Sequence, residues 1–205
     1  MKKLIAVLAF AGLSLSGFAQ DATPTEKYSV STNSFWSNWF VQAGIDWNAW
    51  YSNEEHGQNF ATSPFKKFRS NPGVAVAIGK WFTPGIGLRT KLQGIWGKQV
   101  YDMATGEQGK FNKYWLLNEH IMFNVSNLLY GYNENRVWNV IPFIGGGIGR
   151  TMTHNLYSMD LSAGIQSSWK VAEKLNVYLE AGWNRIEHDI DGGVERGRRG
   201  WDSHD

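Results

Sequence analysis

The chain has 205 residues, a formal net charge of +2 and no cysteine. The length indicates one domain, and the lack of cysteine excludes disulfides, thiolate metal sites and cysteine nucleophiles. Lys2 and Lys3 account for the whole net charge, so the rest of the chain gives no electrostatic reason to expect a nucleic-acid partner.

Residues 1–19 have the three parts of a secretory signal peptide. Two lysines precede an uncharged apolar run over residues 4–15, and G-F-A at residues 17–19 is a small-x-small cleavage site. The apolar run is shorter than the roughly 20 residues that a spanning helix needs. We therefore predict export, with residues 20–35 as a flexible periplasmic lead-in and residues 36–205 as the folded domain.

Residues 39–51 read W-F-V-Q-A-G-I-D-W-N-A-W-Y, with an apolar residue at every odd position. Because the side chains of a strand alternate between its two faces, this segment predicts a strand with one apolar face and one mostly polar face. It covers the roughly 9–11 residues that a tilted strand needs to cross a bilayer. Aromatic residues stand at both ends of the apolar face, where such a strand meets the membrane interfaces.

Six further segments predict strands in the same way, at residues 74–82, 86–101, 114–126, 137–150, 159–171 and 175–186. Short connections at 83–85 and 172–174 contrast with long polar ones at 52–72 and 102–113, as periplasmic turns and outside loops do in bacterial barrels. The pattern predicts an all-β fold, a transmembrane antiparallel up-and-down β-barrel of the eight-stranded type, with seven strands evident. No helical period is evident beyond the predicted signal peptide.

The closing strand of this barrel is missing from the pattern. Bacterial barrels have an even number of strands, and an open edge in lipid would leave backbone groups unpaired. We expect the closing strand to lie beyond Asp205 in a longer chain. The alternative is residues 28–35, whose apolar spacing is poor.

Three segments resemble the barrel of OmpA-family outer-membrane proteins of the Bacteroidales. They are residues 33–44 (N-S-F-W-S-N-W-F-V-Q-A-G), residues 114–128 and residues 141–145 (I-P-F-I-G). The resemblance covers about residues 33–190 and implies an outer-membrane location, with membrane lipids, including lipopolysaccharide, as partners. In that family a linker and a peptidoglycan-binding domain usually follow the barrel, so peptidoglycan is an expected partner only if a further C-terminal domain exists.

The inward faces of the predicted strands carry ionisable side chains. The interior of an eight-stranded barrel is just wide enough for side chains, and an isolated buried charge is costly, so these groups should pair. We predict a lumen ion-pair network that either plugs the barrel or gates a narrow ion path, formed by Asp46, Arg89, Lys91, Asp160, Lys170 and Glu180. His120 is expected to be a buried, hydrogen-bonded histidine on the same face.

An aromatic girdle is predicted at the two membrane interfaces, formed by Trp39, Trp47, Tyr51, Trp96, Trp115, Trp169 and Trp183. Glu119 departs from the pattern, because it places a charge on the face that should meet lipid. We expect either that the register slips locally or that Glu119 lies near a rim.

No catalytic site, metal site or cofactor is predicted. The outer rim is expected to hold Asp160, His154, His188 and Asp189, but no nucleophile–base spacing is evident. The run G-G-G-I-G-R at residues 145–150 lacks the lysine and the helix of a phosphate loop, so we expect its glycines to relieve crowding in the wall. Asp189, Asp191 and Glu195 form an incomplete calcium ligand set.

These features favour a structural role in the cell envelope, with minor passive permeation. The alternative is an adhesin or host-factor-binding barrel that acts through loops 52–72 and 102–113, in which Phe60, Phe65, Phe68 and Phe111 lie among Lys66, Lys67, Arg69 and Lys110. Arg196, Arg198 and Arg199 form a basic stretch that lipopolysaccharide phosphates would suit, although an ordinary solvated loop has the same composition. A secretion-machinery barrel is a third candidate, which the sequence neither supports nor excludes.

Overall fold

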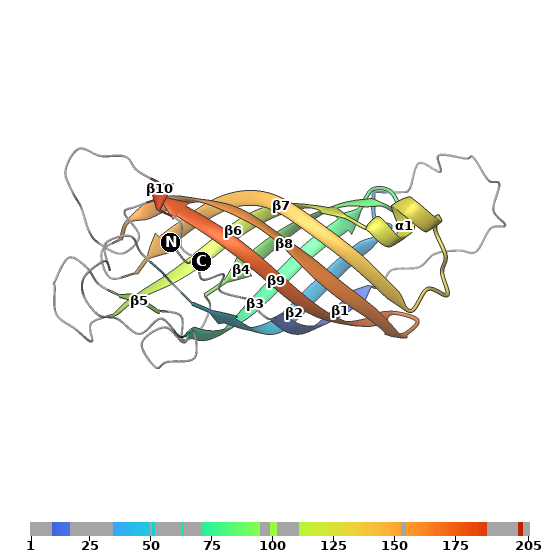
Figure 1. Cartoon of the computed structure of the whole chain (residues 1–205), viewed down its shortest axis with the longest axis horizontal. Coiled ribbons are helices and arrows are strands. Elements are labelled where there is room, and N and C mark those ends of the chain that lie inside the picture. The colour runs from blue at the N-terminus through green and yellow to red at the C-terminus, as the bar shows by residue number, and fades with distance from the viewer. Residues whose placement is uncertain are drawn as a thin grey trace.

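The computed structural model is an antiparallel β-barrel with a short helix at one end (Figure 1). It describes residues 10–16, 35–49, 51, 63, 71–94, 99–101, 111–152, 155–187 and 201–202. Within these residues a ten-stranded sheet follows chain order, except that β5 pairs with β6 alone. Among the described residues, no helix is long and apolar enough to cross a bilayer.

Seven long strands form most of the barrel wall, and each pairs antiparallel with the next one. They are β2 (Trp39–Asn48), β3 (Asn71–Trp81), β4 (Ile86–Gln93), β6 (Phe111–Phe123), β7 (Trp138–Thr151), β8 (Tyr157–Ala172) and β9 (Leu175–Glu187). They confirm the predicted all-β, up-and-down barrel and the existence of all seven predicted strands.

The predicted strand over residues 86–101 is too long. β4 ends at Gln93, and β5 (Gln99–Tyr101) is a separate short strand. Gly94 follows β4 with a φ of 94°, a left-handed conformation that side chains disfavour. A Cβ at this position would also lie 2.4 Å from the carbonyl oxygen of Tyr114. Glycine therefore allows the chain to leave the ladder at this point.

The predicted strand over residues 114–126 also ends too late. β6 ends at Phe123, and Asn124 caps α1 (Val125–Tyr130) by accepting a hydrogen bond from the Asn127 N–H at 3.0 Å. A helix of six residues is too short to produce a helical period, which explains why the sequence pattern did not reveal it.

The barrel is closed by β1 (Phe10–Ser16), which pairs with β2 on one side and with β9 on the other. In this register Leu13 is opposite Ala43 and Val177, and Ser14 is opposite Gln42 and Asn176. The position of the closing strand is thus occupied by part of the predicted signal peptide. The expected alternative, residues 28–35, lies almost wholly outside the described residues, and the cleavage of residues 1–19 stays a prediction.

The wall has apolar side chains outside and polar side chains inside, which is the reverse of a soluble protein. On β2, Val41 and Ile45 are 50% and 69% exposed, whereas Gln42 and Asp46 are 3% and 1% exposed. The same alternation continues on β3, β4 and β6 to β9. This polarity is what a barrel surrounded by lipid requires.

Two apolar layers lie inside the barrel. Phe40, Met122, Ile141 and Phe143 form a buried cluster near the end that carries α1, with Trp81 packed against it. Tyr114, Leu116 and Ile186 form a second buried cluster toward the opposite end. Most of the buried polar side chains come from strand positions between these two layers.

The two ends of the barrel differ in their connections. One end has the short turns at residues 82–85 and 173–174 and the connection that contains α1 (Figure 1). β2 ends and β3 begins at the opposite end, where the predicted outside loop at residues 52–72 would connect them. By the usual asymmetry of bacterial barrels, the end with α1 faces the periplasm and the other end faces outside. The candidate adhesive loops lie almost entirely outside the described residues.

Closure by β1 leads to a prediction for the unprocessed chain. Leu13→Pro removes a backbone N–H from a residue in the middle of β1, and deletion of residues 1–19 leaves the facing edges of β2 and β9 unpaired. Both changes should lower the urea midpoint of the refolded chain in phospholipid vesicles, and the deletion should lower it more. Equal midpoints for all three chains would show that β1 does not stabilise the barrel.

Candidate functional site: the polar lumen

Arg89 on β4 is the centre of a polar network that crosses the lumen. Its Nη1 donates to Glu180 Oε2 at 2.6 Å and lies 3.1 and 3.0 Å from the side-chain oxygens Oε1 of Gln42 and Gln166. The guanidinium carbon lies 4.8 Å from the centre of the Phe143 ring. The side chain is 1% exposed, so these contacts replace its hydration.

Glu180 on β9 is shared by two cations. Its Oε2 pairs with Arg89 and its Oε1 pairs with Lys91 Nζ, each at 2.6 Å. All three side chains are buried. One carboxylate therefore serves two buried cations, and its loss would leave both without this anion.

His120 on β6 is held in one neutral tautomer. Its Nδ1 lies 2.9 Å from Arg89 Nη2, and its Nε2 lies 2.8 Å from Ser162 Oγ. Arginine has only N–H donors, so Nδ1 must accept, and the ring proton sits on Nε2 and points to Ser162. This confirms the expected buried, hydrogen-bonded histidine.

Two glycines of β7 leave space inside the barrel, so that side chains of β6 can pass over β7 and reach β8. A Cβ on Gly145 would lie 2.8 Å from the His120 ring, and a Cβ on Gly147 would lie 2.3 Å from Asn118 Oδ1. Because these positions carry no side chain, His120 reaches Ser162 on β8, and Asn118 donates to Asp160 Oδ2 at 2.6 Å. These contacts confirm the expected role of the glycine run in relieving crowding.

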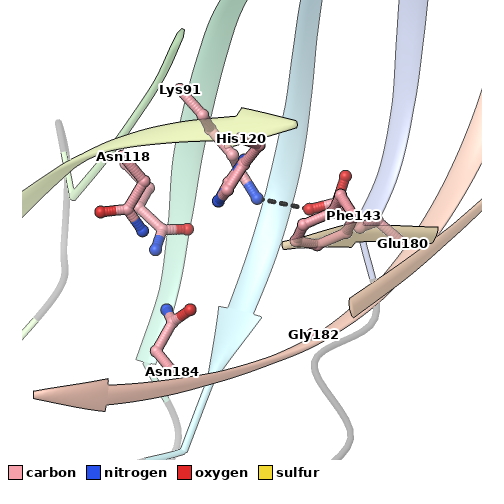
Figure 2. A pocket seen from close by; sticks show the side chains of 8 residues that line it. Lys91, Asn118, His120, Phe143, Glu180, Gly182 and Asn184 are labelled. Carbon is pink, nitrogen blue, oxygen red and sulfur yellow. Dashed lines mark hydrogen bonds and ion pairs between the residues drawn. The ribbon is translucent and has the colours of Figure 1, made fainter. Parts of the chain in front are cut away.

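A cavity of about 10 Å³ remains beside the network (Figure 2). Lys91 and Glu180 lie on its border, joined by their ion pair, and Asn118 and Asn184 border it from other strands. A space of this size holds about one water molecule. Side chains therefore fill this part of the lumen.

The structure brings together only some of the predicted ion-pair residues. Arg89, Lys91 and Glu180 meet directly. Asp160 is buried inside the barrel rather than placed on the outer rim, and its Oδ2 accepts a hydrogen bond from Asn118. Asp46 is buried on the inner face of β2. Lys170 lies elsewhere, because it is near the end of β8 and its Nζ donates to the carbonyl oxygen of Glu134 at 2.9 Å. Its assignment to the lumen network was wrong.

Sequence reasoning missed the neutral members of the network. Gln42 and Gln166 bind Arg89, and Ser162 binds His120, yet none of the three carries a charge. The neutral Asn118 binds Asp160 in the same way. The available signal was their position on the inward faces, since each follows the same alternation as its charged neighbours. The remaining residues of the predicted outer rim, of the incomplete calcium ligand set and of the basic stretch lie outside the described residues. They are His154, His188, Asp189, Asp191, Glu195, Arg196, Arg198 and Arg199.

Five of the predicted girdle residues are on the outward-facing side of their strands, namely Trp39, Trp47, Trp115, Trp169 and Trp183. Trp39 and Trp169 lie near the periplasmic end, and Trp47 and Trp115 near the outside end. Trp183 also faces outward, opposite Ala163, and Tyr51 follows β2. Trp96 lies outside the described residues.

Glu119 remains on the lipid-facing side in the middle of β6, so both explanations expected for it are wrong. The register is regular, with Thr90 and Gly146 directly opposite Glu119. Trp115 and Phe123 lie four residues away on either side, which is roughly 10 Å toward each interface for a strand tilted by about 40°. The carboxylate accepts a hydrogen bond from Thr90 Oγ1 at 2.6 Å, which satisfies one of its oxygens.

The reversed polarity, the closed backbone ladder and the filled lumen define a transmembrane up-and-down β-barrel protein. Two curated proteins of Porphyromonas gingivalis are similar to this chain. Outer membrane protein 40 is 28% identical over 161 residues, which cover 73% of this chain and 39% of that protein. Outer membrane protein 41 is 24% identical over 199 residues, which cover 88% of this chain and 48% of that protein.

The chain is thus an outer-membrane protein, as both relatives are named, and the predicted location is confirmed. Both relatives come from the order expected from the sequence resemblance. The chain spans less than half the length of these relatives. No family model and no solved structure matches it significantly.

The glycines of β7 provide a matched pair of variants. Gly147→Ala places a Cβ 2.0 Å from the Leu117 carbonyl oxygen, so we expect a loss of about 1–3 kcal/mol in the free energy of unfolding. Gly146→Ala points outward and meets its nearest atom at 3.0 Å, so its loss should be clearly smaller. Urea unfolding in vesicles measures both, and equal losses would contradict the account given for Gly147.

Replacement of Glu119 is predicted to raise the free energy of unfolding, whereas replacement of the glycines lowers it. Glu119→Leu removes a carboxylate from the middle of the lipid-facing wall and should raise the free energy of unfolding by about 1 kcal/mol. Glu119→Gln keeps an acceptor for Thr90 and should give a smaller gain. A loss of stability in both variants, measured by urea unfolding in vesicles, would show that the carboxylate is not exposed to lipid.

Proposed function

We propose that this protein is a structural barrel of the outer membrane whose lumen is closed by the Arg89–Glu180–Lys91 ion pairs. The observation that carries the proposal is the sharing of one buried carboxylate by two buried cations from β4. An ion that crosses the barrel would have to displace these contacts in a space that side chains already fill. Permeation is then minor and depends on rare opening of the network.

The apolar layers on either side of the network support the same proposal. Phe40 and Met122 belong to the buried cluster near the periplasmic end, whose Phe143 stacks against Arg89, and Tyr114 and Leu116 belong to the cluster toward the outside end. Apolar side chains do not replace the hydration of a passing ion, so each layer adds a barrier to conduction. Enzymatic activity forms no part of this proposal.

The Glu180→Gln variant tests the proposal. Removing one partner of a buried ion pair costs about 3–5 kcal/mol, because the other charge stays buried without compensation. We expect this variant to unfold at a lower urea concentration and to conduct ions more often than the parent in planar bilayers. Glu173→Gln in the turn between β8 and β9 has the same change in charge and should alter neither property.

Two outcomes would contradict the proposal. A large, continuously open conductance of the parent chain would mean that the lumen is a pore. An unchanged conductance of Glu180→Gln would mean that the ion pairs do not close the path. The variant must first be shown to be folded, which slower unfolding in cold detergent than in heated detergent would demonstrate.

A further inference from the structure

A second group of polar side chains lies on the outer wall, at the end of the barrel opposite α1. Lys113 and Trp115 come from β6, Arg150 from β7 and Tyr157 from β8. Trp115 is directly opposite Arg150, and Arg150 is directly opposite Tyr157. Three adjacent strands thus place two cations and two aromatic rings together, in what we call the outer-rim basic patch.

Arg150 is held in place by neutral groups. Its Nε donates to Asn155 Oδ1 at 2.8 Å, and its Nη2 donates to the same oxygen. The guanidinium carbon lies 5.2 Å from the centre of the Tyr157 ring. Asn155 has a φ of 54°, which asparagine tolerates better than most residues. These contacts fix the guanidinium group and leave its remaining N–H groups available.

The charge of the patch is not neutralised within the described part of the chain. No carboxylate there forms an ion pair with Arg150 or Lys113. Glu187 is on β9, two strands away from Arg150, and accepts a hydrogen bond from the Met159 N–H at 3.4 Å. Lys113 is exposed. Among the described residues, the patch therefore carries two positive charges that have no ion-pair partner.

The position of the patch matches the headgroup level of the outer leaflet. Trp115 is at the outside end of the aromatic girdle, and Lys113 lies two residues further along the same face. The Met152 N–H donates to the Lys113 carbonyl oxygen at 2.6 Å, so Lys113 and Arg150 are diagonal neighbours. Such neighbours are roughly 7–8 Å apart, and their long side chains reach a common anion.

We propose that the outer-rim basic patch binds a phosphate group of lipopolysaccharide in the outer leaflet. Arginine presents a planar set of N–H donors that suits phosphate oxygens, and lysine adds a second cation beside it. The two aromatic rings lie at the boundary between acyl chains and headgroups, where such rings are favoured. The proposal rests on the orientation of the barrel and is independent of whether the lumen conducts.

The test compares lipopolysaccharide that carries its lipid phosphates with the same preparation after dephosphorylation. The full chain, refolded in neutral detergent, should bind the phosphorylated form at least tenfold more tightly, and added salt should weaken that binding. The double variant Lys113→Gln/Arg150→Gln should lose this preference. Lys174→Gln at the opposite end has the same loss of charge per site and should bind like the parent.

Three outcomes would overturn the proposal. The first is equal binding of the two lipid preparations, and the second is full retention of the preference in the double variant. The third is competition by millimolar inorganic phosphate that is as effective as competition by the lipid, because this would indicate a site for free anions. If the double variant does not refold, Lys113→Gln alone decides, because the Lys113 side chain forms no hydrogen bond or ion pair with the described residues. It should weaken binding of the phosphorylated form by about threefold or more, and an unchanged affinity would count against the proposal.

Discussion

The structure depends on one constraint, which is that a backbone inside lipid has to satisfy its N–H and C=O groups within the protein. The ladder from β2 to β9 does so for every strand except at its two edges, and β1 joins those edges. Closing a sheet of this size leaves an interior just wide enough for side chains. The size of every inward residue then matters, and Gly145 and Gly147 provide the space that larger neighbours need.

The narrow interior in turn decides how charge is arranged. Arg89 and Lys91 cannot be hydrated inside the barrel, so both depend on Glu180, and the remaining Arg89 donors use neutral acceptors. The contacts of Arg89 and its partners extend to β2, β6, β8 and β9. A slip of one residue in any of these strands would turn its member of the network toward lipid. The polar network therefore also specifies the register of the wall.

Much of the wall was predictable from the sequence because the period of a strand is two, and an apolar residue at every second position identifies both faces at once. This reasoning found seven strands and the inward positions of Arg89, Lys91 and Glu180. It did not find α1, the break at Gly94 or the pairing of β1, which depend on caps, turns and distant partners. Alternation does not indicate how far along the barrel axis a residue lies. For that reason it placed Lys170 in the lumen network, although the Lys170 side chain is hydrogen-bonded at the periplasmic end.

The distance of an outward-facing charge from the membrane interfaces also determines how that charge is accommodated. Lys80 follows the outward alternation of β3 but lies near the periplasmic end, where its ammonium group bonds to the Phe35 carbonyl and lies 5.1 and 5.6 Å from the Phe35 and Trp39 rings. A long side chain near an interface can reach polar groups in this way. Glu119 is roughly 10 Å from either aromatic border, which its short side chain cannot span, so it depends on Thr90. Arg150 lies at the outer border itself, where a charge with no ion-pair partner in the described part of the chain faces headgroups instead of acyl chains, so the same wall tolerates it.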